Sequence, residues 1–140
     1  MFELHSQLQK DCIVLGSFDL CQLLLVNDTC YPWFILVPQR PGISEIFQLD
    51  EDDQRQLMLE SNTLSALLYT HFVADKMNVA ALGNMVPQLH IHHIVRYRND
   101  AAWPQPVWGV KKAIAYEKQE LSALIQGLKA VLAGRNFQSL

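Results

Sequence analysis

Three short apolar runs constrain the fold of this chain more than any other feature of its sequence. They cover residues 12–15, 21–26 and 33–37, and segments rich in Gly, Ser, Asn and Asp separate them at 16–19 and 27–29. Apolar runs of this length with turn-forming residues between them are typical of strands that pair with their neighbours along the chain. We therefore expect an antiparallel meander in the first third of the chain.

Two longer segments have helical periodicity. The first follows Asp50, its expected N-cap, and runs to about residue 75, with acidic residues at 51–53 where the helix dipole favours them. Its leucines recur on one face, so this long helix should pack on the sheet. The second covers residues 117–133, with Gly134 as its expected stop. Weaker patterns predict a short helix over 3–10 and a fourth strand over 78–83.

The segment 88–93 reads Gln-Leu-His-Ile-His-His and alternates polar with apolar residues. In a strand, alternate side chains point to opposite faces, so Gln88, His90 and His92 should share one face, with neighbours about 6.6 Å apart. That spacing is about the span of a phosphate group with its ester oxygens. This row is the candidate active site, while residues 89 and 91 should face the long helix.

A metal site is the alternative interpretation of these histidines, because His is the commonest metal ligand. His93 cannot converge with His90 and His92 in a regular strand, and no Cys or carboxylate lies near them in the sequence. We expect no metal and no cofactor. His93 should be a hydrogen-bonded structural histidine on the packed side.

At these residues the sequence resembles the signature of the histidine triad (HIT) superfamily of nucleotide hydrolases and transferases. Matching Gly83 and Val86 to that signature places Gln88, His90 and His92 at its three triad positions. The second position holds the family's nucleophile. Gln88 departs from the usual histidine. A second departure follows in the same signature: Met85 stands where many members carry a serine that hydrogen-bonds the leaving group.

The resemblance implies catalytic roles for the triad face. A neutral imidazole is a good nucleophile towards phosphorus, so His90 would form a covalent intermediate that water then opens. Its other ring nitrogen should donate to a backbone carbonyl, which fixes the tautomer. His92 would stay protonated beside the phosphate, and the Gln88 and Asn84 amides would donate to its oxygens.

The resemblance also implies an α+β, HIT-like fold: an antiparallel sheet of about five strands, a long helix across one face and an additional C-terminal helix. It covers residues 12–104 of a single domain, 1–140, and implies a homodimer. Candidate substrate-binding residues are Asn27, Asp28, Asn78, Asn84, Arg96 and Trp103. Four of these have alternatives: a plain turn for Asn27 and Asp28, a surface arginine for Arg96, and simple packing for Trp103.

Composition excludes some classes of protein. Half of the residues are apolar and 18% are charged, which excludes a mainly disordered chain. A net charge of −3 gives no sign of a nucleic-acid or anionic-membrane surface. No signal peptide is visible, and the apolar runs are too short to span a bilayer. Three cysteines without zinc-like pairing indicate reduced thiols in a cytoplasmic protein.

The first functional hypothesis is a nucleotide phosphoramidase, hydrolase or nucleotidyl transferase that acts at the α-phosphate of a purine nucleotide or nucleotide conjugate through His90. The second is a nucleotide-binding or interaction module whose degenerate triad has little turnover, which a gain of activity in Gln88→His would favour. The third is a metal-dependent enzyme. Bound metal in the purified protein would favour the third.

Overall fold

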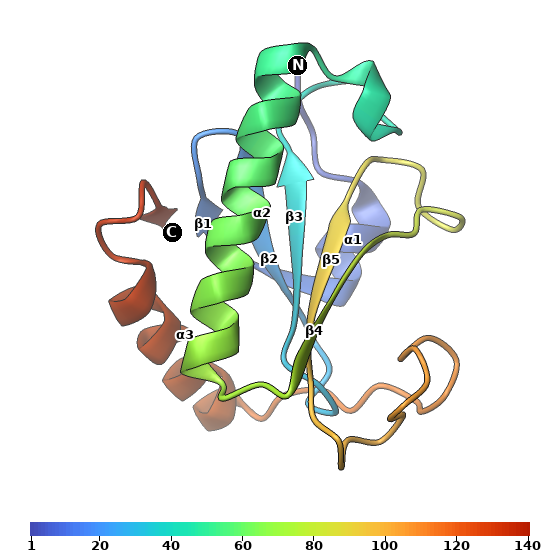
Figure 1. Cartoon of the computed structure of the whole chain (residues 1–140), viewed down its shortest axis with the longest axis vertical. Helices are drawn as coiled ribbons and strands as arrows, with labels where there is room; N and C mark the ends of the chain where they lie inside the picture. Colours follow the sequence, from blue (N-terminus) through green and yellow to red (C-terminus); the bar gives the residue numbers. More distant parts are fainter.

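The expected meander forms the centre of a six-stranded antiparallel sheet (Figure 1) in a computed structural model that describes all 140 residues. The strand order is β4-β5-β3-β2-β1-β6. The strands are β1 (Cys12–Ser17), β2 (Cys21–Val26), β3 (Trp33–Pro38), β4 (Lys76–Ala81), β5 (Ile91–Arg96) and β6 (Gln138–Ser139). The helices are α1 (Ser6–Asp11), the 3₁₀ turn η1 (Ile46–Gln48), α2 (Glu51–His71) and α3 (Lys118–Leu132).

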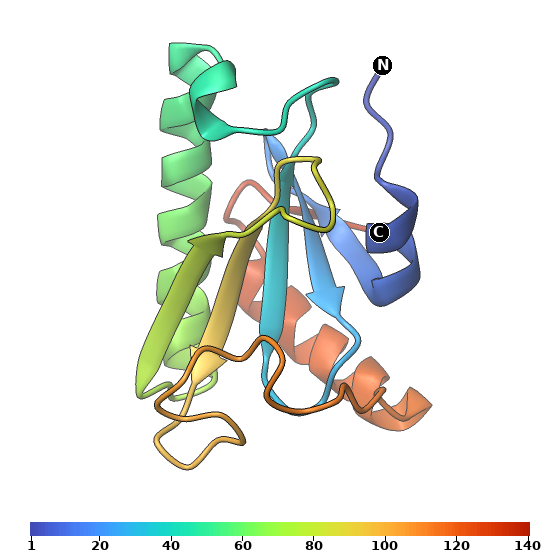
Figure 2. The same cartoon turned by 90° about the vertical axis from the view of Figure 1, so that its right-hand side faces the viewer.

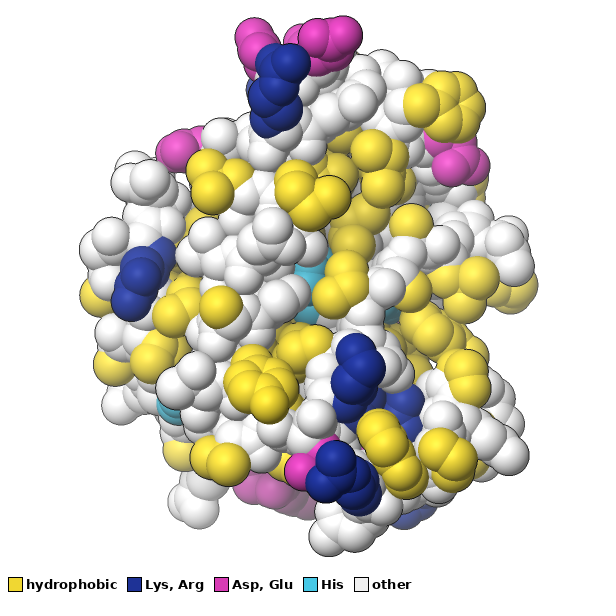
Figure 3. All heavy atoms as spheres, in the orientation of Figure 1, with side chains coloured by type: hydrophobic (Ala, Val, Ile, Leu, Met, Phe, Trp, Pro, Cys, Tyr) yellow, Lys and Arg dark blue, Asp and Glu magenta, His cyan; other side chains and the backbone are white.

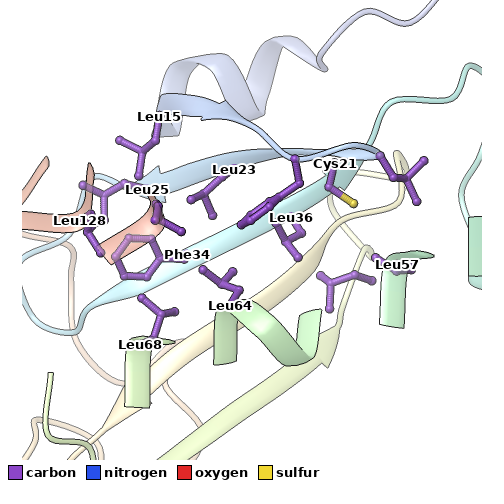
Figure 4. Packing of buried hydrophobic residues seen from close by; sticks show 14 of the residues in the cluster. Leu15, Cys21, Leu23, Leu25, Phe34, Leu36, Leu57, Leu64, Leu68 and Leu128 are labelled. Carbon is purple, nitrogen blue, oxygen red and sulfur yellow. The ribbon is translucent and has the colours of Figure 1, made fainter. Parts of the chain in front are cut away.

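Helix α2 crosses one face of the sheet, as predicted. The Asp50 carboxylate accepts a hydrogen bond from the Asp53 amide at 2.8 Å, which confirms the N-cap. The helix ends at His71, earlier than expected. Figure 4 shows its leucines packed against alternate residues of β2 and β3. This core contains Leu23, Leu25, Phe34, Leu36, Leu57, Leu64 and Leu68, and includes Leu89 and Ile91 as predicted.

The opposite face of the sheet is only partly covered. Figure 2 shows α1 on the side away from α2, where Leu4 and Leu8 pack on Leu24, Ile35 and Val37. Because α1 has six residues, it covers one end of the face. The rest of this face is left uncovered by α1, and His90 and His92 lie there.

The C-terminal segment adds more than the expected helix. α3 packs Leu128 and Leu132 into the main core and is followed by Gly134 in a left-handed conformation. Beyond it, β6 pairs with Gly16 and Ser17 of β1, so the sheet has six strands. A Cβ atom at Gly16 would collide with the Gln138 carbonyl, which explains the glycine at this pairing. None of the helices combines the length and the apolar character that a membrane span requires.

Candidate active site

A cavity of about 490 Å³ lies on the sheet face that α1 leaves partly open. Nine of its thirteen lining residues are apolar, among them Trp33 and Trp108. The other four are Asp11, Asn84, His90 and His92. The structure therefore brings Asn84 together with two of the three predicted triad residues.

His90 is held in one tautomer. It lies just before β5, is 5% exposed, and its Nδ1 is 2.7 Å from the Gln88 carbonyl oxygen. A carbonyl can only accept a hydrogen bond, so Nδ1 carries the proton. Nε2 is then left with a free lone pair. This is the arrangement expected of a nucleophilic histidine.

His92 is held in the opposite tautomer. The indole Nε1 of Trp33 donates to its Nδ1 at 2.9 Å, so in the neutral ring the proton is on Nε2. Burial, followed by the nearby charge of His90, lowers the pKa of His92 to about 4. The His92 ring is therefore neutral at pH 7 in the free protein, because it is buried among aromatic side chains. The expectation that it is protonated beside a phosphate concerns the complex and stays a prediction.

The Nε2 atom of His92 is buried and makes no hydrogen bond of good geometry, and the backbone group that favours its protonated form is the Leu82 carbonyl. The rings of Trp33 and Trp108 lie 5.7 and 5.0 Å from the His92 ring, and the His90 ring lies 4.9 Å away. Unpaired buried donors are costly and rare in folded proteins. An N–H group of a cavity-lining residue without a well-aligned partner is suited to bind an oxygen atom of a ligand.

Gln88 does not line this cavity with the two histidines. It lies before β5, and its side-chain amide is engaged elsewhere. Its side chain is bonded to the backbone of residues 3 and 5. Gln88 lines a second cavity, of about 290 Å³, which shares Asn84 and His90 with the first.

Arg96 is a buried structural residue. It is 1% exposed and makes four hydrogen bonds: two to Asp100 and one each to Asn78 and the Gln105 carbonyl. Its guanidinium also lies over the ring of Trp103. The structure therefore does not bring Asn78, Arg96 or Trp103 to the cavity. Of the two tryptophans that follow β5, Trp108 is the one that lines the cavity.

Asn27 and Asp28 form a turn and lie outside the cavity lining. The Asn27 side chain accepts from the Tyr116 amide, and the buried Asp28 carboxylate accepts from the amides of Cys30 and Ile114. These bonds tie the β2–β3 turn to the segment before α3. The carboxylate at the cavity is that of Asp11, which the sequence did not single out.

His93 confirms the expectation of a structural histidine. Its Nδ1 donates to the Ile91 carbonyl at 3.0 Å, and its Nε2 accepts from the Ser61 hydroxyl of α2 at 2.7 Å. Burial lowers its pKa to about 4. Histidine atoms are visible only in small areas of the face shown in Figure 3.

Two further residues of the cavity cannot assist by proton transfer or attack. Met85 is 94% exposed and its thioether has no proton to donate. Burial, with the Asp11 charge second, raises the pKa of the Cys12 thiol to about 12, so it remains protonated at neutral pH. No group of three or more His, Cys, Asp or Glu side chains is arranged to hold a metal ion.

Comparison with known proteins gives a consistent result. The model of the HIT domain family matches residues 7–99. A histidine triad protein from Marinobacter aquaeolei VT8 is 49% identical, with a TM-score of 0.92 over 94% of this chain and 96% of that one. One from Bradyrhizobium japonicum is 46% identical, with a TM-score of 0.90 over 92% and 96%. A search of curated proteins found no match.

More distant structures share the fold alone. A hypothetical histidine triad nucleotide-binding protein from Sulfolobus tokodaii strain7 is 15% identical, with a TM-score of 0.67 over 86% of this chain and 83% of that one. The HIT-like fold expected from the sequence is confirmed, with six strands in place of about five.

Proposed function

This chain belongs to the HIT domain family, and we propose that it is a nucleotide phosphoramidase, hydrolase or nucleotidyl transferase. The proposed nucleophile is Nε2 of His90, and the proposed substrate is a purine nucleotide conjugate cleaved at its α-phosphate. The observation that carries this proposal is the bond from His90 Nδ1 to the Gln88 carbonyl, because it places the lone pair of the neutral ring on Nε2.

The reaction has two displacements at phosphorus. Nε2 of His90 forms a bond to the α-phosphorus as the bond to the leaving group breaks, and the leaving group departs with that electron pair and takes a proton from water. Water then attacks the phosphorus, the bond to Nε2 breaks, and the nucleoside monophosphate leaves. In a transferase, another acceptor replaces the water. Each displacement is easier than a single direct hydrolysis.

His92 and Asn84 supply hydrogen bonds in this scheme. The Nε2–H of His92 makes no well-aligned hydrogen bond in the free protein and would donate to a phosphate oxygen, as would the Asn84 amide. An anionic phosphate beside His92 would raise the pKa of its ring, so binding and partial charge on His92 are linked. The mainly apolar cavity suits a flat nucleobase.

A nucleotide-binding module with little turnover is the second candidate. Two observations favour it: the Gln88 side chain bonds the N-terminal backbone instead of completing a triad, and Met85 has no proton for the leaving group. Both proposals predict nucleotide binding. They differ in whether His90 forms a covalent bond to phosphorus.

The test incubates the protein with an adenosine phosphoramidate and with a dinucleoside polyphosphate, and compares the wild type with His90→Asn. We expect AMP from the wild type alone, and the AMP–His90 adduct should be trapped by mass spectrometry after acid-free quenching. Equal AMP release by His90→Asn would exclude the His90 mechanism. If neither protein releases AMP from these substrates but both still bind AMP, the binding module would be established.

We also propose that the protein is a cytoplasmic homodimer. β4 is an edge strand that pairs only with β5, and Val79 on it is half exposed, so a second copy could pair there. The three cysteines are free thiols, which fits a reducing compartment. Light scattering of the wild type and of Val79→Lys tests the dimer, because a charge on this edge should give monomers.

A further inference from the structure

The side chain of Gln88 bonds in two directions to the start of the chain. Its Oε1 accepts from the backbone N–H of His5, and its Nε2 donates to the backbone carbonyl of Glu3, both at 2.9 Å. These bonds join residues that are 83 and 85 positions apart. One amide group therefore fastens the N-terminal segment to the loop that carries His90.

The chemistry of this contact requires an amide. A glutamine side chain presents an acceptor and a donor side by side in one plane, which matches a backbone N–H and C=O two residues apart, as in a pair of strands. The two nitrogens of an imidazole point in diverging directions, so one ring cannot bond to the backbone N–H and to the C=O at the same time. A histidine at position 88 would therefore leave one backbone group without its partner.

The segment fastened in this way forms a wall of the active-site cavity. His5 is the N-cap of α1, and Leu4 and Leu8 are buried against the sheet face. Leu8 and Asp11 from α1 both line the 490 Å³ cavity. Since α1 has only six residues, such tethers add to the packing of Leu4 and Leu8 in fixing its position.

Gln88 also contacts the nucleophile through its backbone. Its carbonyl oxygen accepts the Nδ1 proton of His90 at 2.7 Å. The same residue thus holds the tautomer of His90 through its main chain and the cavity wall through its side chain.

We propose that Gln88 is a positioning residue that clamps the N-terminal segment and so shapes the pocket for the nucleoside part of the substrate. This inference rests on the proposed function for the identity of the ligand. The glutamine at the first triad position then has a structural role. Its amide binds the backbone of the N-terminal segment, and that segment forms the cavity wall that the substrate contacts.

Two pairs of variants test the clamp. Gln88→Met keeps the length of the side chain but removes both hydrogen bonds, and Gln126→Met makes the same change at an exposed site on α3. His5→Pro removes the N–H that Gln88 accepts, and the φ of −55° at His5 is compatible with proline. His5→Ala is its control, because it loses the same side chain and keeps the N–H.

The first measurement is amide hydrogen exchange of residues 6–11, which needs no turnover. We expect exchange to rise about tenfold in Gln88→Met and about fivefold in His5→Pro relative to His5→Ala. The effects should be less than additive in the double variant, because both remove the same contact. Unchanged exchange in Gln88→Met, or equal exchange in His5→Pro and His5→Ala, would overturn the clamp.

The second measurement is the binding of AMP by calorimetry and the turnover of adenosine phosphoramidate. We expect the AMP dissociation constant and KM to rise about tenfold in Gln88→Met, with a smaller change in kcat. Looser exchange with unchanged AMP binding would overturn the role in the pocket. Absence of turnover in the wild type, with the expected exchange and AMP binding, would count against the catalytic proposal and support the clamp.

Discussion

The indole N–H of Trp33 donates to Nδ1 of His92 at 2.9 Å, and it thereby fixes which nitrogen of His92 faces the cavity as a donor. An indole can only donate, so the contact excludes the tautomer with the proton on Nδ1. Trp33 lies on β3 and His92 on the neighbouring β5, and the two strands pair in register at Ile35 and His92. This contact between β3 and β5 therefore fixes the tautomer of the neutral His92 ring.

Replacing Trp33 by Phe should release this constraint while keeping an aromatic ring in the same place. We expect kcat to fall about fivefold, the value of one ordinary hydrogen bond. Nitrogen NMR of the His92 ring should change from one tautomer to a mixture. Trp108→Phe is the matched control, because Trp108 contacts the same ring only by edge-to-face packing. An unchanged tautomer in Trp33→Phe would show that another group orients His92.

The sequence predicts local features of the site better than its long-range contacts. The meander, the Asp50 cap and the packing of residues 89 and 91 follow from periodicity and turn residues, which are properties of short segments. The bonds of Gln88 and Trp33 join residues 59 to 85 positions apart, and one sequence contains no signal for them. Arg96 shows the same limit. Its parity places it on the face of His92, but Asp100 and Asn78 occupy its donors.

Stability should fall as the pH is lowered from about 6.5 to about 4. His92 and His93 are neutral in the folded protein, with pKa values lowered to about 4 from 6.5. The unfolded chain binds protons at these histidines first, so each contributes a loss of up to about 1.4 kcal/mol per pH unit in this range. Above pH 6.5 both histidines are neutral in the folded and in the unfolded chain, so they no longer make the free energy of unfolding depend on pH.

Urea unfolding at pH 7.5, 6.0 and 5.0 measures this loss. His93→Asn should show about half of the wild-type slope, while His71→Asn, at an exposed position on α2, should keep it. A free energy of unfolding that is constant from pH 7.5 to 5.0 would contradict the low pKa values of both buried histidines.

The bond between Ser61 and His93 should contribute to stability without contributing to chemistry. Ser61→Ala removes the only donor to His93 Nε2 and leaves a buried acceptor without a partner, at a cost of about 1–2 kcal/mol. Because His93 faces α2 and not the cavity, turnover below the melting temperature should change less than about twofold. Ser122→Ala on the exposed side of α3 is the control for the intrinsic effect of the substitution. A large loss of turnover in folded Ser61→Ala would show that His93 affects the reaction.

The ion pair of Arg96 and Asp100 holds the first part of the loop that leads to Trp108, whose ring packs edge-to-face with His92. The Asp100 carboxylate accepts from Arg96 at 2.7 Å and from the backbone amides of three loop residues, Tyr97, Ala102 and Trp103. Burial favours its protonation, but Arg96 and these amides outweigh that effect and lower the pKa of Asp100. Removing the cation would leave a buried carboxylate without compensation.

We therefore expect Arg96→Met to lose about 3–5 kcal/mol of unfolding free energy, because breaking a buried pair costs this much. Asp100→Asn should lose less, since the amide oxygen still accepts from the loop. Arg55→Met is the control: its pairs with Glu51 and Asp52 are exposed, so the change should be within about 0.5 kcal/mol. Urea unfolding followed by tryptophan fluorescence measures all three variants. Equal stability of Arg96→Met and Arg55→Met would mean that the loop and Trp108 are held by packing alone.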